Sequence, residues 1–268
     1  MPARPSPTDH RGPPGGGAGT GGTGRDGTTP SAAGPARGTP RRPLDGDRAL
    51  VVGGERGLGR HVVAALARAG ADVAVAYDLD RPDAHDDARE AEDLVTRSGR
   101  AGLLLPADLT DHARCHQLVG DTVEHLGGLD VLVHVVTPEE TASGAAVRDV
   151  EPAAWRRTWA LLVDSLVHTT TAALDPLAGG GRLLTTARPP AGARSGEPLG
   201  PRVAAAAVEE LSRALAEQLA GTGTRVVCVV PAPGADVDLV AEGYVRLAAP
   251  GEGPAPAGPV VVGRPAPS

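Results

Sequence analysis

The chain has 268 residues, an apolar content of 41% and a formal net charge of −7. This length and this apolar content suffice for one large domain with a sizeable core. The acidic balance argues against nucleic-acid partners, and no stretch approaches the ~18 apolar residues of a membrane span. We therefore expect a cytoplasmic protein that binds neither nucleic acid nor membrane.

The first part of the chain has a composition of its own. Residues 1–43 are mostly Gly, Pro, Thr, Ser, Ala and Arg, with almost no large apolar side chain. Such a segment buries too little apolar surface to offset its ordering entropy. We predict a disordered tail over 1–43 and a single folded domain over 44–268.

Apolar strands alternate with helical patterns from residue 48 onwards. The expected strands are 49–54, 72–77, 102–110, 129–136, 181–187, 224–231 and 259–263. The expected helices are 57–70, a polar helix within 83–99, one that ends at Leu126, and then 152–174, 202–220 and 238–248. Repeated strand–helix–strand units of this size predict an α/β protein with a Rossmann-type, doubly wound parallel sheet.

The first strand-to-helix turn is rich in glycine. It reads VVGGERGLGR, with Gly53, Gly57 and Gly59 between the strand and the helix. Glycines let the backbone approach a pyrophosphate closely, and the helix amino terminus adds free N–H groups and the positive end of a dipole. In this context the turn predicts dinucleotide binding.

The spacing of these glycines resembles the TGxxxGxG loop of the short-chain dehydrogenase/reductase family. The resemblance runs from about residue 48 to 263 and is strongest to the branch with an extended amino terminus, through AYDLDRPDAHDD after the second strand. It implies cofactor contacts at Gly53, Arg56, Gly57, Leu58, Gly59, Tyr77, Asp108 and Leu109.

The resemblance also bears on the choice of cofactor. Arg56 matches the basic residue that meets the 2′-phosphate in NADP-preferring members, and Tyr77 stands where NAD-preferring members place an aspartate. These positions favour NADP over NAD, although Asp78 would repel a phosphate. Two simpler roles stay open: Arg56 as a solvated charge, and Asp108, expected beside adenine, as a helix cap.

The family's catalytic residues are all substituted. Its reaction needs a tyrosine, a lysine that lowers the tyrosine pKa, a serine and an asparagine. The resemblance places these four on Pro201, Ala205, Arg188 and Leu162 respectively, and the chain contains no lysine at all. We therefore expect that proton-coupled hydride transfer has been lost.

Further departures concern the rest of the expected active site. His134 begins HVVT where the family has an Asn-Asn-Ala-Gly sequence, and Asp236 stands where a threonine hydroxyl often reaches the cofactor. The family's loop of roughly 25 to 30 residues before the last helix, which forms a lid over the substrate, has no counterpart after Pro231. We expect no closed, dry substrate pocket.

Other residues were weighed as replacements. Thr185, Thr186 and Tyr244 are the candidates for displaced catalytic groups, although packing is the simpler role for each. His112 and His116 have a spacing that suits a metal, but no third ligand follows, so no metal site is expected. Two loop residues without a paired base, Ser195 and Glu197, do not support a hydrolase.

The leading hypothesis is a pseudoenzyme that still binds NADP weakly, as a binding or partner subunit. The family associates through helices equivalent to 152–174 and 202–220, which implies a homodimer or a mixed oligomer with a related reductase. The alternatives are an active NAD(P)H-dependent oxidoreductase on a carbonyl or alcohol with displaced catalytic residues, and a member that binds no cofactor.

Overall fold

A parallel sheet of seven strands organises the chain. The computed structural model describes residues 41–81, 83–136, 147–187, 198–251, 256 and 258–263. Within them the strands are β1 (Arg48–Val52), β2 (Asp72–Asp78), β3 (Gly102–Ala107), β4 (Val131–His134), β5 (Arg182–Thr186), β6 (Arg225–Pro231) and β7 (Val260–Val262). Their order is β3-β2-β1-β4-β5-β6-β7, and every pairing is parallel. The predicted Rossmann-type fold is confirmed.

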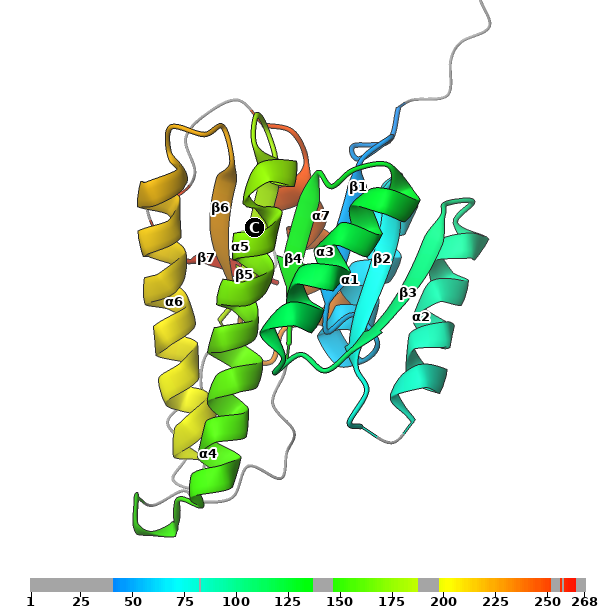
Figure 1. Cartoon of the computed structure of the whole chain (residues 1–268). Helices are drawn as coiled ribbons and strands as arrows, with labels where there is room; N and C mark the ends of the chain where they lie inside the picture. Colours follow the sequence, from blue (N-terminus) through cyan, green and yellow to red (C-terminus); the bar gives the residue numbers. More distant parts are fainter. Residues whose placement is uncertain are drawn as a thin grey trace, which may run out of the picture. The chain divides into compact units, whose positions relative to one another are not determined.

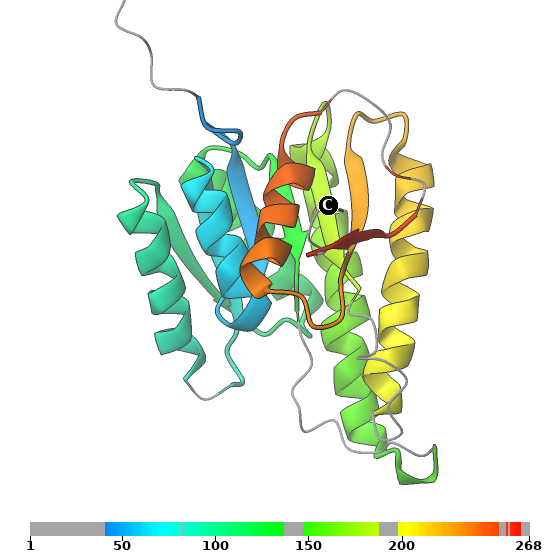
Figure 2. The ribbon, with the colours of Figure 1, turned by 180° about the vertical axis from the view of Figure 1, so that it is seen from behind.

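Helices cover both faces of the sheet. One face carries α1 (Gly57–Arg68), α2 (Ala84–Arg97) and α7 (Val237–Ala248), which lie in front in Figure 2. The other carries α3 (His112–Leu126), α4 (Pro152–Trp159), α5 (Ser165–Leu177) and α6 (Leu199–Leu219), which lie in front in Figure 1. None of these described helices combines the length and apolar content needed to cross a lipid bilayer.

Alternate residues of the central strand β1 pack into the two parts of the core, which lie on opposite faces of the sheet. Val51 packs with the cluster under α1 and α7, whereas Leu50 and Val52 pack with the cluster under α3 and α5. All three side chains are fully buried. A central parallel strand covered on both faces needs such a continuous apolar sequence, and this is the pattern that made the strand recognisable.

Two helices differ from the sequence prediction. The segment expected as one helix over 152–174 is α4, a π-helical turn over Ala160–Asp164, and α5, which ends at Leu177. The helix expected from 202 starts at Leu199, so Pro201 lies in its first turn. Proline is tolerated there because the first N–H groups of a helix have no partner within the helix.

The carboxyl end of the sheet has a short final connection. Only residues 232–236 separate β6 from α7, which agrees with the absence of a lid insertion noted in the sequence. Residues 1–40 of the predicted tail lie outside the described residues. Leu44, where the folded domain was expected to begin, is 1% exposed and packs against the core.

Candidate functional site

The carboxyl ends of the parallel strands form one edge, the lower edge of the sheet in Figure 1. The chain leaves β1 and turns into α1 on one face, whereas it leaves the neighbouring strand β4 towards the helices of the other face. This change of direction creates a crevice, and ligands of doubly wound sheets bind at such a switch point. The loop after β1 is therefore the first place to look for a site.

Two of the three glycines of this loop are required by close backbone contacts. Gly53 has a positive φ of 82°, and an added Cβ would lie 2.9 Å from Cα of Val136. At Gly59 a Cβ would collide with the carbonyl oxygen of Gly53. Gly57 has a φ of 50°, yet a Cβ there would meet open space. Two glycines thus permit the tight turn, and the third leaves backbone accessible from outside.

The helix that follows the loop starts without a cap. No side chain accepts a hydrogen bond from the first N–H groups of α1, and its first turn holds no acidic residue. By contrast, Asp111 caps α3 by accepting from the N–H groups of Ala113 and Arg114. Uncapped N–H groups and the helix dipole favour an anion at the start of α1.

A buried carboxylate lies in the same loop. Glu55 is only 6% exposed, and its Oε2 has no hydrogen-bond partner among the described residues. Its Oε1 lies 3.7 Å from Nε of Arg56 and 3.7 Å from Nη2 of Arg81. Burial raises the pKa of the Glu55 carboxyl. The sequence analysis did not single out this residue, because burial of a glutamate is not visible in a Gly-rich loop.

The residues expected around adenosine are only partly free to contact it. Tyr77 is 1% exposed, and its hydroxyl lies 2.7 Å from Nδ1 of His85. Leu109 is buried in the core at 1% exposure. Asp108 is half-buried and accepts hydrogen bonds from the N–H and hydroxyl of Thr110, so it does not cap α3 as one reading proposed. Of the three, Asp108 alone is not fully buried.

Two further carboxylates join Asp108. Oxygen atoms of Asp78, Asp80 and Asp108 lie within 4.8 Å of one another, and this is the one potential metal-binding group among the described residues. Arg157 of α4 reaches across to Asp78 at 2.9 Å and Asp80 at 3.1 Å. Burial, aided by the neighbouring carboxylates, raises the pKa of Asp78. Arg157 thus compensates only part of the negative charge of this acidic group.

The described catalytic positions hold no proton donor. Leu162 lies in the π-helical turn and is buried against α6. Pro201 lines a crevice of about 10 Å³ with Trp155 and Thr158, and Ala205 follows one turn later on α6. Arg188, at the serine position, lies outside the described residues. None of the three described side chains can exchange a proton with a substrate.

His134, at the end of β4, is part of the core. It is 3% exposed, and its Nε2 lies 2.8 Å from the hydroxyl of Ser165, which in turn donates to the carbonyl of Leu161. Burial lowers the pKa of the His134 imidazole to about 3. A ring that stays neutral at physiological pH and is held by a serine is a packed group and is not a proton shuttle.

The three candidates for displaced catalytic groups are bonded to one another or to the core. Thr185 is fully buried, with its hydroxyl 2.6 Å from that of Ser212. Thr186 shares a 2.7 Å hydrogen bond with the hydroxyl of Tyr244. Tyr244 is fully buried, and burial raises its pKa. These hydroxyls satisfy each other's hydrogen bonds, which favours a structural role for them.

A third histidine joins the pair noted in the sequence. His168 of α5 packs against His112 with ring centroids 4.7 Å apart, and His112 packs against His116 at 4.4 Å. The neighbour was not recognisable from sequence because it comes from a different helix. Three ligand atoms of this trio do not gather within 4.8 Å, as those of the aspartates do.

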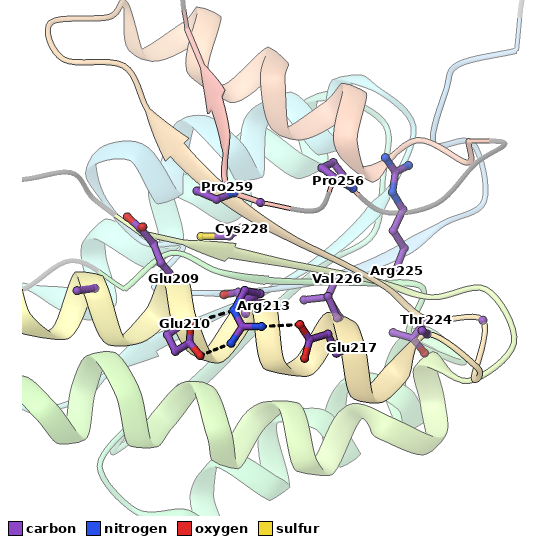
Figure 3. A pocket seen from close by; sticks show the side chains of 16 residues that line it. Glu209, Glu210, Arg213, Glu217, Thr224, Arg225, Val226, Cys228, Pro256 and Pro259 are labelled. Atoms are coloured by element: carbon purple, nitrogen blue, oxygen red, sulfur yellow. Dashed lines mark hydrogen bonds and ion pairs between the residues drawn. The ribbon is translucent and has the colours of Figure 1, made fainter.

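A large hollow lies elsewhere, between α6 and β6. It has a volume of about 680 Å³, and Figure 3 shows Glu210, Arg213 and Glu217 of α6 among its lining residues, together with Val226 of β6 and Thr224, which precedes that strand. Arg213 pairs with both glutamates, so its charge is fully engaged on this wall. The hollow follows the start of β6, away from the loop after β1, and it does not contribute to the candidate site.

Comparison with known proteins supplies independent information. The family model described as enoyl-(acyl carrier protein) reductase matches residues 52–239. Uncharacterized oxidoreductase YhxD of Bacillus subtilis (strain 168) and uncharacterized oxidoreductase YghA of Escherichia coli (strain K12) are each 35% identical, over 190 and 186 residues. These matches cover 71% and 69% of this chain. The chain spans 62% of the length of each relative.

A solved structure is also similar. It is a short-chain dehydrogenase from Burkholderia cenocepacia J2315 in complex with NADP, with a TM-score of 0.69 and 25% sequence identity. The similarity covers 77% of this chain and 92% of that chain. The shared part therefore includes most of the sheet and its helices.

Proposed function

Because this chain belongs to the short-chain dehydrogenase/reductase family, we propose that it binds a nicotinamide dinucleotide through the loop after β1 and has lost the family's catalysis. The observation that carries the binding proposal is the geometry of Gly53, Gly57 and Gly59, two of which exclude any side chain. The uncapped start of α1 supplies N–H groups for a pyrophosphate. The similar Burkholderia structure is a complex with NADP, which supports dinucleotide binding by this chain.

The loss of catalysis is proposed from side-chain chemistry. A bound nicotinamide cofactor supplies hydride transfer, and the protein must supply the accompanying proton. Leu162, Pro201 and Ala205 have no ionisable group, and no lysine exists in the chain to lower the pKa of another donor. Loss of a general acid alone typically costs about 10²–10⁴ in rate.

The alternative of an active enzyme with displaced residues has little support. It needs a hydroxyl that faces a substrate, and Thr185, Thr186 and Tyr244 are engaged with other side chains. The connection over 232–236 also leaves no residues for a lid. A third alternative, loss of dinucleotide binding, is an outcome of the following experiment.

The experiment measures binding and turnover on the full chain. Binding is followed by fluorescence of NADH and NADPH, and turnover by their oxidation with a panel of aldehydes and ketones. We expect saturable binding without turnover, and at least a hundredfold weaker binding in Gly57→Asp, whose carboxylate would face the pyrophosphate. Gly57→Asn is the matched control, because asparagine has the same shape and also tolerates a positive φ. Turnover would refute the loss of catalysis, and absent binding would refute the cofactor site.

We also propose that the protein acts as a subunit, either of a homodimer or of a mixed oligomer with a related reductase. The support is exposed apolar surface on α5 and α6: Val167, Leu174 and Val203 are 38–39% exposed. Val167 and Leu174 are seven residues apart and so lie on one face of α5. Sedimentation of the full chain should show a dimer that Leu174→Arg weakens; a monomer in both would refute the homodimer.

A further inference from the structure

The buried carboxylate of Glu55 belongs to a loop that borders the adenosine ribose in dinucleotide-binding folds of this type. In folds of this type the ribose sits between the loop after the first strand and the end of the second strand. Glu55 belongs to that loop, and its Oε1 is 3.7 Å from Arg81, which follows the end of β2 by three residues. Glu55 therefore connects the two segments that border the ribose.

The free oxygen of Glu55 suits a hydroxyl and opposes a phosphate. Oε2 is buried and has no hydrogen-bond partner among the described residues, which is an uncommon and costly state for a carboxylate. Oε2 has almost no accessible surface, so a ribose 2′-hydroxyl would donate to it after a small shift of the Glu55 side chain. A 2′-phosphate offers acceptor oxygens and negative charge, so it would leave Oε2 without a hydrogen bond and would repel the carboxylate.

The neighbouring arginines are already neutralised. Arg60 is bonded to Asp87 at 3.0 Å and to Glu90 at 2.6 Å. Arg81 is bonded to Asp87 at 2.7 Å. Arg56, which the sequence analysis assigned to the 2′-phosphate, is 3.7 Å from Glu55. A phosphate would have to compete with these carboxylates for each guanidinium.

The other side of the ribose position is acidic as well. Asp78, the last residue of β2, lies with Asp80 and Asp108 in the carboxylate group described above, with Arg157 as its partner. The side chain of Asp78 is 15% exposed, so its charge is little screened by solvent. Carboxylates thus approach the ribose position from the β1 loop and from the ends of β2 and β3.

From these two sets of carboxylates we infer that the site selects a ribose with a free 2′-hydroxyl, that is NAD(H) over NADP(H), and that Glu55 enforces the choice. The inference rests on the proposed dinucleotide site and reverses the preference expected from Arg56. The inferred preference depends on the charges of this chain. The glycine loop accepts either cofactor, and the acidic residues around it set the preference between NAD(H) and NADP(H).

Calorimetric titration of the full chain with NADH and NADPH tests the inference. We expect NADH to bind at least about tenfold more tightly than NADPH. Glu55→Gln keeps the shape of the side chain, removes its charge and adds a donor, so it should strengthen NADPH binding at least about tenfold. Glu55→Ser, which removes the buried group altogether, is the second variant and should shift the ratio in the same direction.

The matched control is Glu90→Gln, which removes a carboxylate from the same charged group at a side chain that is 68% exposed. It should change the NADPH to NADH ratio by less than about twofold. Tighter binding of NADPH by the wild type, or an unchanged ratio in both Glu55 variants, would overturn the inference and leave the dinucleotide site standing. No binding of either cofactor by the folded protein would overturn the dinucleotide site, and the inference with it.

Discussion

The loop after β1 and the ends of β4 and β5 lie along one edge of the same sheet, yet their side chains have different surroundings. In the loop, Gly57 faces open space and Glu55 keeps an unpartnered oxygen. At the ends of β4 and β5, His134 is hydrogen-bonded to the hydroxyl of Ser165 and Thr186 to that of Tyr244. The first region holds polar groups that a ligand could satisfy, whereas the side chains of the second region are packed into the core.

The difference teaches that a backbone site and a side-chain site are constrained by different physics. A pyrophosphate site is built from backbone, so its glycines are fixed by φ and by close contacts. Proton transfer depends on side chains, and leucine or alanine fits the same helix without cost to the fold. We therefore expect variants of the second region to change stability and variants of the loop to change binding as well.

Protonation of His134 should give the largest effect on stability. Burial lowers its pKa to about 3, whereas it titrates near 6.5 in the unfolded chain. Between these values only the unfolded chain binds the proton, so the free energy of unfolding should fall as the pH drops from about 6.5 towards 3. The slope is at most about 1.4 kcal/mol per pH unit, and about 5 kcal/mol in all.

Urea denaturation at several pH values measures this slope. His134→Gln should lose less stability than the wild type over the same window, and His125→Gln, at an exposed position of α3, should follow the wild type. If the free energy of unfolding depended on pH in the same way for the wild type and His134→Gln, the end of β4 would be hydrated. The two regions would then not differ in the way described.

Gly59→Ala should come next, with a loss of about 1–3 kcal/mol in the free energy of unfolding. The added Cβ would collide with the carbonyl oxygen of Gly53, so the turn must open. Gly120→Ala is the control, because a Cβ at that position of α3 meets nothing within 4 Å and should stabilise the protein slightly. Equal stability of Gly59→Ala and wild type in denaturation would contradict the required close packing of the loop.

Tyr244→Phe should cost about 1 kcal/mol of stability, because it leaves the hydroxyl of Thr186 without its partner. Cofactor affinity should stay the same within about twofold. If calorimetry instead shows that Tyr244→Phe alters NADH binding, the ends of β5 and α7 belong to the ligand site. The difference between the loop after β1 and the ends of β4 and β5 is then smaller than described.

The smallest effect is expected when two catalytic residues are put back. Pro201→Tyr with Ala205→Lys places a tyrosine and a lysine at the positions of α6 to which the family resemblance assigns them, while Leu162 and Arg188 stay at the positions that it assigns to asparagine and serine. We expect no detectable oxidation of NADH by aldehydes and unchanged cofactor affinity. Measurable turnover would show that the second region remains a usable active site.

The sequence predicted what depends on local pattern. The seven strands and the order of helices follow from apolar periodicity, and the phosphate loop follows from three glycines between a strand and a helix. The start of α6 lies three residues before the predicted residue 202, because proline is accepted in the first turn of a helix.

Pairings between distant elements were not predictable in the same way. Arg157 meets Asp78 across 79 residues, and His168 meets His112 only because α5 packs against α3. Tyr77 was aligned with a cofactor contact, but its side chain turns into the core beside α2, where His85 holds its hydroxyl. Glu55 was passed over because the packing of its neighbours, and not its sequence context, buries it.

Hydrogen exchange of the full chain with and without NADH, read by mass spectrometry, compares the two regions in one measurement. The account predicts that NADH slows exchange most strongly in peptides over 53–60, where the N–H groups at the start of α1 would meet the pyrophosphate, and changes it little at the start of α6 over 199–205. Unchanged exchange over 53–60 in a folded protein saturated with NADH would contradict the central claim that this loop is the binding site.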